Sequence, residues 1–385
     1  MNRRVFIRWA GGGLVFAALP SLSGCSSEIP AEAVAAWQGP MNAANEREWI
    51  LSYAILAPHS HNLQSWLVDL RQPDEITLYC DLSRLLPETD PYSRQIMMSH
   101  GTFLELLDLA ARQKGLRAEI ELFPEGEFDS TKIDQRPVAR IRLATDNNVK
   151  KDPLFTQIMK RRTNREAYEP RNIPPAAVAD ITDSVATYQV RLGFVGSDKP
   201  DLLVKHRAIA AEAWRIELVT PRTILESYKV LRVGPEEIAT YRDGISLNKL
   251  FPRILVSLGL FDRSQAPAPS DSAVISQIKD FNSKLDSTPA FFWMITEGND
   301  RKTQVNAGRA YVRAQLAATQ HGLSMQPISQ ALQEYPEVAK PYAEIHQLLD
   351  APRPSYTVQM WTRLGYAPAI GPSPRRGLKE HIIRS

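Results

Sequence analysis

The stretch Gly101–Leu116, GTFLELLDLAARQKGL, has a counterpart in Gly308–Leu323, GRAYVRAQLAATQHGL, at a constant offset of 207 residues. The two segments share Gly, Leu, Ala, Ala, Gln, Gly and Leu, which is seven of sixteen positions. Each has the apolar spacing of an amphipathic helix and closes on a glycine, the residue that most often follows a helix. The shared register indicates two copies of one unit, and two unrelated helices with the usual glycine ending stay as the alternative.

Residues around the first copy predict strands that such a helix can cover. Residues 46–57 carry apolar side chains at helical spacing and stop at Pro58. The other elements expected in this half are strands at 66–70, 76–80, 117–123 and 138–145, with a long helix at 95–114.

The second copy has similar surroundings. A continuous apolar run at 289–296 predicts a buried strand before the helix, and residues 356–365 predict a strand after it. Residues 221–272 fit neither copy, so we expect an insertion there that could act as a lid. The sequence therefore predicts an α/β (α+β) fold, a mixed sheet flanked by helices, with one half at 46–150 and the other at 151–385.

The first 25 residues have the order of an export signal. Three arginines within the first eight residues precede a short apolar run, and the following Leu-Ser-Gly-Cys25 resembles a bacterial lipobox. The arginine pair resembles the twin-arginine signature, whose export machinery carries folded proteins. We expect a lipid on Cys25, a tether at 26–45 and a membrane-anchored body outside the cytoplasm, periplasmic in a Gram-negative host. A Sec signal with an incidental cysteine is the alternative.

Composition limits the classes of function. The chain has 46 Lys and Arg against 43 Asp and Glu, and three of the arginines leave with the signal, so the exported body is close to neutral. A nucleic-acid-binding protein would carry a basic surface, so no nucleic-acid partner is expected. Cys25 and Cys80 are the only cysteines, and a lipid on the first leaves Cys80 unpaired in an expected strand.

Polar side chains between the first helix and the first strand form one candidate binding segment. Ala57–Trp66, APHSHNLQSW, offers the hydroxyl of Ser60 and the amides of Asn62 and Gln64. These groups both donate and accept hydrogen bonds, which suits the edge of a planar heterocycle. Turn formation and capping by Ser60 and Asn62 is the structural alternative.

Two arginine-rich segments indicate a phosphate-bearing ligand. Lys160–Arg165, KRRTNR, places three arginines around a hydroxyl, and guanidinium groups match phosphate oxygens two at a time. Arg375 and Arg376 follow Pro374, which limits the conformational freedom of that segment. A solvated basic helix end and a disordered basic tail are the respective alternatives.

Other motifs for nucleotide binding or nucleophilic catalysis are absent from the sequence. It has no Gly-x-Gly-x-x-Gly after a strand, no Walker loop and no Gly-x-Ser-x-Gly elbow. His59 and His61 could ligate a metal, but the spacing suggests no third ligand, so we expect no metal site.

Taken in order, these segments resemble the motifs of the nitroreductase family, in particular its Acg-like branch of long, internally duplicated chains. Ala57–Trp66 is similar to the family's Ala-Pro-Ser-x-x-Asn-x-Gln-Pro-Trp loop, with Ser65 where proline is usual. Arg161–Tyr168 is similar to its Arg-Arg-Ser-x-Arg-x-Phe motif, with Thr163 for serine and one extra residue before the aromatic. Pro374–Leu378 is similar to its C-terminal Arg-Arg-Pro-Leu.

The resemblance implies one FMN per chain, bound between the halves of a monomeric pseudo-dimer, because family members are usually homodimers with FMN at the interface. Arg165 would lie near the N1/O2 edge of the isoalloxazine, where a cation stabilises the reduced ring. The motifs assign the phosphate and ribityl groups to Arg161, Thr163, Arg375 and Arg376. They assign the ring and its surroundings to Ser60, Asn62, Gln64, Ser324, Met325, Gln326 and Pro327.

Two functions are compatible with such a site. The first is an FMN-dependent oxidoreductase that passes a hydride or electron pair through flavin N5 from a small-molecule donor to a nitroaromatic or quinone-like acceptor. The flavin then carries the chemistry, and no catalytic side chain is needed. The second is a flavin-sequestering protein with little turnover, in which residues 221–272 cover the ring. A scaffold that has lost its cofactor is a third alternative.

Overall fold

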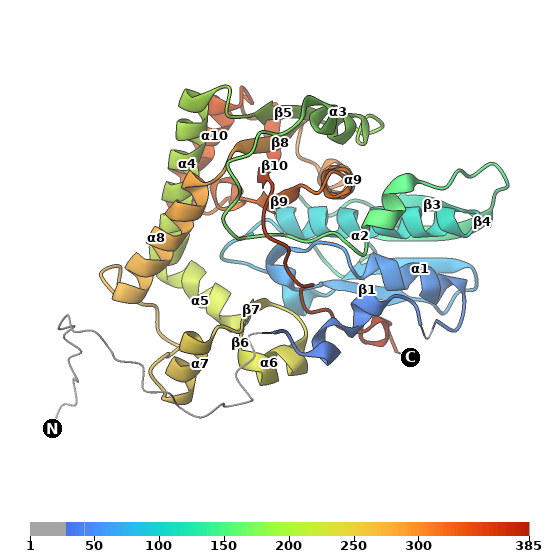
Figure 1. Ribbon diagram of the computed structural model, residues 1–385. Coiled ribbons are helices and arrows are strands. Elements are labelled where there is room, and N and C mark those ends of the chain that lie inside the picture. Colours follow the sequence, from blue (N-terminus) through green and yellow to red (C-terminus); the bar gives the residue numbers. More distant parts are fainter. Residues whose placement is uncertain (1–27, 42, 385) are drawn as a thin grey trace.

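The computed structural model describes residues 28–41 and 43–384, so the expected signal and Cys25 lie outside the described residues. Two four-stranded sheets are present, one before residue 150 in the chain and one after it (Figure 1). The first has the order β1-β2-β4-β3, with strands β1 (Trp66–Asp69), β2 (Glu75–Cys80), β4 (Ala139–Thr145) and β3 (Leu116–Leu122). The second has the order β5-β8-β10-β9, with strands β5 (Arg191–Val195), β8 (Ala290–Glu297), β10 (Tyr356–Gly365) and β9 (Ser324–Pro327).

The two sheets follow the same plan. In each, the first two strands pair, a long helix follows, and the fourth strand returns to lie between the second and the third. The long helices are α2 (Arg94–Gln113) and α9 (Arg301–Gln320), whose ends are separated by the same 207 residues as the sequence repeat. Helix α2 and the strands β1, β2, β3, β4, β8 and β10 lie within one residue of the positions that the sequence predicts, whereas α9 begins seven residues before the repeat at 308, and β5 and β9 were not predicted.

Helices α2 and α9 pack against each other at the centre of the molecule (Figure 1). A Cβ on Gly101 would lie 1.9 Å from the carbonyl oxygen of Val305, and a Cβ on Gly308 would lie 1.9 Å from that of Met98. Backbones approach this closely only where there is no side chain. The contact is reciprocal, because Gly101 and Gly308 are equivalent positions of the repeat, and so are Met98 and Val305.

Local sequence fixes the ends of the long helices. Asp300 caps α9 by accepting a hydrogen bond from the backbone of Thr303 at 2.7 Å. Gly115 and Gly322 follow the two helices with φ of +71° and +69°, a backbone conformation that favours glycine. The helix-ending role that the sequence predicts for these glycines is confirmed.

The other elements of the two halves are shorter. The helices are α1 (Glu46–Ala54), α3 (Pro175–Asp183) and α10 (Ala339–Leu348). The 3-10 turns are η1 (Ala31–Gln38), η2 (Ser60–Asn62), η3 (Leu82–Arg84), η4 (Pro153–Gln157), η5 (Gln330–Leu332), η6 (Pro336–Val338) and η7 (Leu378–Glu380). None of the helices in the described residues combines the length and apolarity needed to cross a bilayer.

An insertion of residues 196–289 separates β5 from β8, whereas the equivalent strands β1 and β2 are joined by a short turn. The insertion is longer than the lid expected at 221–272, because it also includes a long helix before that segment and another after it. Its elements are α4 (Pro200–Val219), α5 (Pro221–Lys229), β6 (Leu231–Val233), α6 (Gly234–Tyr241), β7 (Ile245–Leu247), α7 (Leu250–Ser257) and α8 (Ser272–Asp286).

The segment expected as a tether, 26–45, is partly packed against the body. Turn η1 buries Ala33 and Trp37, and Trp37 Nε1 donates to the carbonyl oxygen of Ser373 at 2.8 Å. Burial of the indole removes apolar surface from water, which explains why this part of the segment does not run free.

The C-terminal segment also joins the halves. Ile382 lies in a parallel bridge beside Val68 of β1, so the first sheet becomes mixed at this edge. A hydrophobic core then runs through both halves, with residues of both sheets and both long helices, among them Trp66, Phe103, Met294 and Ala310. The halves therefore share one interior.

Candidate cofactor site

Arginines from two distant segments meet at the end of α1. Arg161 and Arg162 follow η4, and Arg375 lies in the C-terminal segment after β10. Arg161 Nη2 donates to the carbonyl oxygen of Leu56 at 3.0 Å, and Arg375 Nη2 donates to the same oxygen at 3.5 Å. We call Arg161, Arg162 and Arg375 the arginine cluster.

The arginine cluster has no counter-charge among the described residues. Its hydrogen-bond acceptors are backbone carbonyls, amides and a hydroxyl, and the Nε atoms of all three side chains are buried without a partner. Burial lowers the pKa of Arg161 to about 10. Burial, together with the charges of Arg161 and Arg162, lowers the pKa of Arg375 well below its usual value. An anion with several oxygens would relieve both the desolvation and the repulsion.

Trp37 covers one side of the arginine cluster. The centroid of its ring lies 4.5 Å from the guanidinium carbon of Arg162, 5.5 Å from that of Arg375 and 5.7 Å from that of Arg161. Cation–π attraction offsets part of the cost of burying these charges. A ligand would therefore reach the guanidinium groups from another side.

The loop at 57–65 holds the C-terminal segment in place. The backbone φ angles of His61, Asn62 and Gln64 are 49°, 56° and 55°. Residues other than glycine adopt such positive angles only where surrounding contacts hold them there. Asn62 supplies such contacts: its Oδ1 accepts from Arg375 Nη1, and its Nδ2 donates to the carbonyl oxygen of Pro374 at 3.1 Å.

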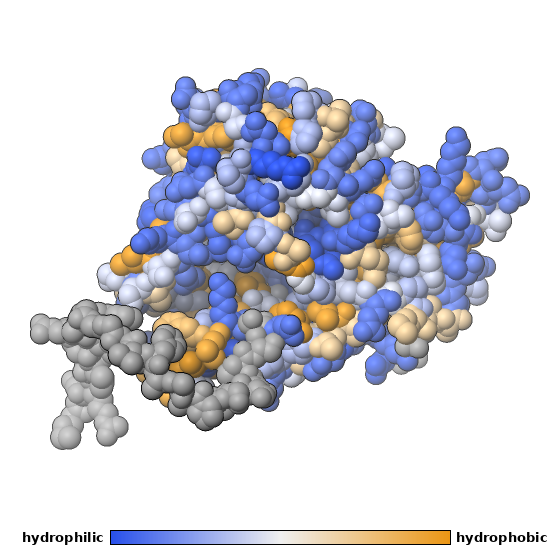
Figure 2. All heavy atoms as spheres, viewed as in Figure 1, coloured by the Kyte–Doolittle hydropathy of each residue, from blue (hydrophilic) through white to orange (hydrophobic). Residues whose placement is uncertain are grey.

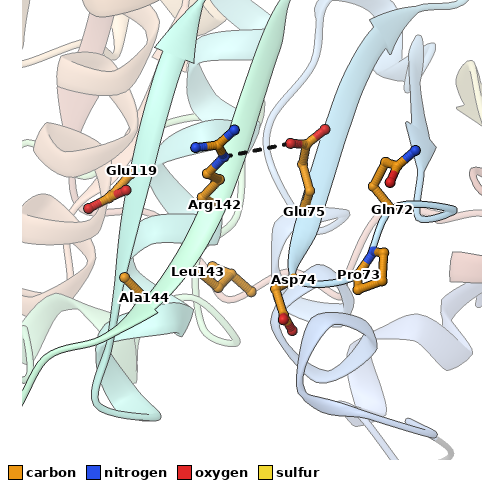
Figure 3. A pocket seen from close by; sticks show the side chains of 8 residues that line it. All are labelled: Gln72, Pro73, Asp74, Glu75, Glu119, Arg142, Leu143 and Ala144. Atoms are coloured by element: carbon orange, nitrogen blue, oxygen red, sulfur yellow. Dashed lines mark ion pairs between the residues drawn. The ribbon is translucent and has the colours of Figure 1, made fainter.

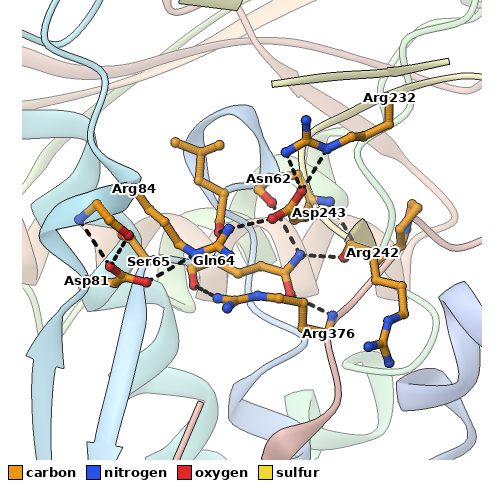
Figure 4. A network of polar contacts seen from close by, with 12 residues as sticks. Asn62, Gln64, Ser65, Asp81, Arg84, Arg232, Arg242, Asp243 and Arg376 are labelled. Atoms are coloured by element: carbon orange, nitrogen blue, oxygen red, sulfur yellow. Dashed lines mark hydrogen bonds and ion pairs between the residues drawn. The ribbon is translucent and has the colours of Figure 1, made fainter. Parts of the chain in front are cut away.

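Gln64 lies at the centre of a polar network that joins the loop, the C-terminal segment and the insertion (Figure 4). The side chain is fully buried. Its Oε1 accepts from the backbone nitrogen of Arg376, and its Nε2 donates to the carbonyl oxygen of Arg242, each at 2.9 Å. Both ends of the amide are used within the protein, so Gln64 does not present a free amide to a ring, as the motif implies.

Arg376, like Arg375, is bound to this loop, and its Nε is also buried without a partner. Its Nη2 donates to the carbonyl oxygen of Gln64 at 2.5 Å, and burial lowers its pKa to about 10. Its Nη2 also lies 3.4 Å from Nδ1 of His381, so the guanidinium anchors the C-terminal segment beside this histidine.

Arg165 and His61 lie near each other, beside the arginine cluster. Arg165 is exposed to solvent, yet burial among neighbouring groups lowers its pKa. His61 is half-buried, and desolvation followed by the charge of Arg165 lowers its pKa to about 4. The buried hydroxyl of Tyr311 has no partner, and Tyr311 influences the pKa of both Arg161 and Arg165, so it is a neighbour that Arg165 and the cluster share.

Two more residues that the motifs assign lie at this junction. Thr163 Oγ1 accepts from Gln315 Nε2 at 3.5 Å, and Gln315 Oε1 accepts from Arg161 Nη1 at 3.4 Å. Ser60 lies against α2, where its Oγ donates to Gln95 Oε1 at 3.4 Å. Thr163 is thus linked to the arginine cluster, and Ser60 lies in the same loop as Asn62.

The segment Ser324–Pro327 is strand β9, which pairs with β10. Met325 is buried in the core that both halves share, so its side chain is taken up by packing. Gln326 Oε1 accepts from Arg363 Nε at 2.9 Å, and Arg363 Nη2 donates to the carbonyl oxygen of Glu166 at 3.1 Å. Gln326 is therefore connected to the residue after Arg165 through Arg363.

Three other features that sequence or shape could suggest as sites are less suited to a cofactor. A cavity of about 440 Å³ opens over β2, β3 and β4, and two of its four charged residues, Glu75 and Arg142, pair with each other at 3.8 Å (Figure 3). Around His59 and His61, as elsewhere in the described residues, no His, Cys, Asp or Glu side chains gather in a group suited to a metal ion. Burial raises the pKa of the Cys80 thiol to about 12, so this cysteine is unreactive.

Sequence reasoning missed three residues at the site. Trp37 lies in a segment that resembled a linker, and only its bulk among small residues signalled that it is buried. Tyr311 and Gln315 are four residues apart on the buried face of α9. Polar side chains on an otherwise apolar helix face are the signal that could have identified both.

The fold and the site together define a class: an α/β protein with two similar halves and a buried cationic site where they meet. No family model matches the chain. Over 352 residues it is 27% identical to a protein of Mycobacterium tuberculosis named "Putative NAD(P)H nitroreductase Rv3131", covering 86% of this chain and 90% of the relative. An uncharacterized protein of the same species is 25% identical over 285 residues, 73% of this chain and 38% of that protein. The chain is thus similar, along most of its length, to a protein named as a nitroreductase.

Two solved structures whose names include nitroreductase match part of the chain. The FMN-dependent nitroreductase NfnB of Mycobacterium smegmatis, in complex with NADPH, covers 60% of this chain and 96% of its own, with 17% identity and a TM-score of 0.37. The FMN- and NADPH-dependent NfnB of a Sphingopyxis strain covers 61% and 99%, with 15% identity and a TM-score of 0.38.

Proposed function

We propose that the chain is an FMN-dependent oxidoreductase of the nitroreductase type, with one FMN held where the two halves meet. The observation that carries this proposal is the arginine cluster, buried without a counter-anion and with three unpartnered Nε atoms. A phosphate ester supplies the charge and the oxygens that such a cluster needs.

The residues of the junction fit the parts of this cofactor. Arg161 and Arg375 would hold the phosphate, and Thr163 lies one hydrogen bond from Gln315, itself a partner of Arg161. Arg165 would supply the cation that the motif places near the N1/O2 edge of the ring. When bound, FMN supplies hydride or electron-pair transfer at N5, so this chain has only to bind, orient and screen the reactants.

Two motif residues take a different role in this proposal. Gln64 and Arg376 bind each other and the insertion, so they position the C-terminal segment that carries Arg375. The amide of Gln64 has no free end, and Nη2 of Arg376 is bound to Gln64, whereas Nε of Arg376 has no partner. We assign them to positioning the site, and Asn62 with them, because its amide holds Arg375 and Pro374.

The name of the mycobacterial relative makes NAD(P)H the first electron donor to test. The acceptor would be a small nitroaromatic or quinone-like molecule. If the body is exported, NAD(P)H is scarce around it, and another donor would have to reach the same site.

A flavin-sequestering function is the second candidate, favoured by the contacts of the insertion. Gly244 donates to the carbonyl oxygen of Asn62 at 3.1 Å, and Asp243 forms ion pairs with Arg84 and Arg232 (Figure 4). The insertion is therefore fastened to the loop of the site from outside. An insertion held over the site in this way would slow both the exchange of bound flavin and its reaction with other molecules.

One spectrum with a mass measurement separates these candidates. We expect the purified protein to show flavin absorbance and to release one FMN per chain. Bleaching by NAD(P)H followed by reoxidation on adding a nitroaromatic or quinone supports the oxidoreductase, and a flavin that resists both supports sequestration. A colourless protein that takes up no added FMN contradicts both.

We also propose three features of the residues before the described part of the chain and two of the molecule as a whole. They are export by the twin-arginine machinery, a lipid on Cys25 and a membrane-anchored position outside the cytoplasm. Internal duplication and a monomeric pseudo-dimer are proposed as well, supported by the matching strand orders and by the reciprocal contact of Gly101 and Gly308. Mass analysis of the mature N-terminus and light scattering test the lipid and the monomer, respectively.

A further inference from the structure

The insertion exposes an apolar surface that the proposed function does not use. Helix α7 has no buried residue, although six of its eight residues, LFPRILVS, are apolar. Phe251 and Leu258 are 68% and 64% exposed, and Ile254 lies between them on the same face of the helix. We call the residues Leu250, Phe251, Ile254, Leu258 and Leu260 the α7 patch.

The patch is concentrated in one place. Most of the large apolar side chains that are exposed in the described residues fall within 241–260, and Figure 2 shows apolar atoms gathered over α7. An exposed apolar surface of this kind in a folded protein marks an interaction site. Lys249, exposed at the start of the helix, adds a positive charge beside it.

The described chain begins next to this patch. Asn248, the residue two positions before α7, donates from Nδ2 to the carbonyl oxygen of Glu28 at 2.6 Å. Cys25 is only three residues before Glu28, and three residues of extended chain span at most about 11 Å. The lipid proposed on Cys25 is therefore confined to the neighbourhood of α7.

We propose that the α7 patch docks onto the lipid bilayer and fixes how the anchored body is oriented on the membrane. The proposal rests on the lipid attachment proposed for Cys25. With the acyl chains inserted, the patch lies within a few residues' reach of the bilayer surface. Short amphipathic helices bind there by burying their apolar face to about 5–10 Å depth, and a lysine at the edge favours anionic lipid.

The test places a reporter on the patch in the full-length, lipid-bearing protein. In Leu258→Cys, the new thiol is labelled with a polarity-sensitive fluorophore, since Cys80 is buried and the acylated Cys25 does not react. Val204→Cys, an equally exposed apolar position on α4, is the matched control. The vesicles are phosphatidylcholine with roughly a quarter phosphatidylglycerol and brominated acyl chains.

We expect the fluorophore at position 258 to shift to the blue and to be quenched by the brominated chains, and the one at 204 to do neither. Phe251→Glu should abolish the shift, whereas Ile275→Glu on α8 should leave it. Equal behaviour at 258 and 204 overturns the proposal, and so does a blue shift at 258 without lipid, which would mean that a second copy covers the patch. Labelling of Cys25 in the parent protein reveals a missing lipid, so failure of the anchor is distinguishable from failure of the patch.

Discussion

Arg161, Arg162 and Arg375 concentrate positive charge where the protein interior would normally exclude it. Burying a guanidinium costs free energy that an ion pair usually offsets, and here the acceptors are neutral groups and the ring of Trp37. The cluster therefore lowers the free energy of unfolding of the unliganded protein, and a bound anion would raise it. Its cost should be visible as a gain in stability when FMN or phosphate is added.

The arginine cluster makes the first residue-scale prediction. Arg161→Ala should lower flavin occupancy roughly tenfold or more, because it removes a charge-assisted contact to a desolvated phosphate. Arg161→Lys should fall between, since an ammonium group keeps the charge but cannot form the two-pronged contact. Released FMN per chain is the readout. Arg117→Ala, at an exposed arginine of β3, is the control, and equal occupancy in all four proteins would rule out the phosphate assignment.

Glu217 of α4 makes a prediction about pH. Burial raises the pKa of its carboxyl to about 7, although Gln333 Nε2 donates to it at 2.8 Å. The unfolded value is about 4.3, so folding takes up a proton between these values. The stability that the neutral acid provides is complete below about pH 4 and is lost as the pH rises through 7.

Glu217→Gln should therefore be more stable than the parent at pH 8, by about 2–3 kcal/mol, and nearly equal to it at pH 4. Urea unfolding at the two pH values measures this difference. Glu119→Gln, at an exposed side chain of β3, should change little at either pH. A gain at pH 8 that persists unchanged at pH 4 would show that the effect is not titration of Glu217.

At the scale of elements, the crossing of α2 and α9 decides how the two halves face each other. Its geometry depends on the absence of two side chains, one from each helix. Gly101→Ala and Gly308→Ala should each destabilise the fold by about 1–3 kcal/mol, because the added methyl group would overlap a carbonyl oxygen of the other helix. Gly371→Ala, where nothing lies within 4 Å, should be neutral. Thermal unfolding compares the three, and unchanged melting of Gly101→Ala would contradict the close approach.

The same elements show how much of the fold could be predicted from the sequence. Apolar periodicity and the helix-ending glycines placed the long helices and the strands, because these signals are local. The match between Gly101 and Gly308 was visible as a repeat, but its reason was not, since a close approach of two backbones is a property of the pair. The extent of the insertion and the packing of part of the expected tether at 26–45 were not predicted, because their apolar residues find partners that are far away in sequence.

The site was predictable in its charges and less so in its contacts. Arginines in two segments pointed to an anion, and the structure brings Arg161 and Arg375 to one carbonyl oxygen. The motif could not show that the amide of Gln64 is already satisfied by Arg376 and Arg242, because hydrogen-bond partners are settled only by the folded backbone.

At the scale of the whole molecule, the site depends on both halves. The loop that holds Arg375 belongs to the first half, Arg161 and Arg375 belong to the second, and Ile382 pairs with Val68 across the boundary. Neither half alone contains a complete arginine cluster with its loop. If the chain is internally duplicated, as proposed, one molecule would achieve what a dimer achieves with two.

Cleavage at the boundary tests this dependence. A protease site placed after Asn148, in an exposed stretch between the sheets, allows the folded chain to be cut. The nicked protein should keep its flavin, since the shared core and the crossing helices hold the halves together. Denaturing separation and refolding should leave each half without FMN, and mixing the refolded halves should restore binding close to one per pair, with the uncut protein refolded in the same way as the control. If the half that ends at Asn148 bound FMN by itself, the loop and not the arginines would make the site, and the pseudo-dimer would carry two independent sites instead of one.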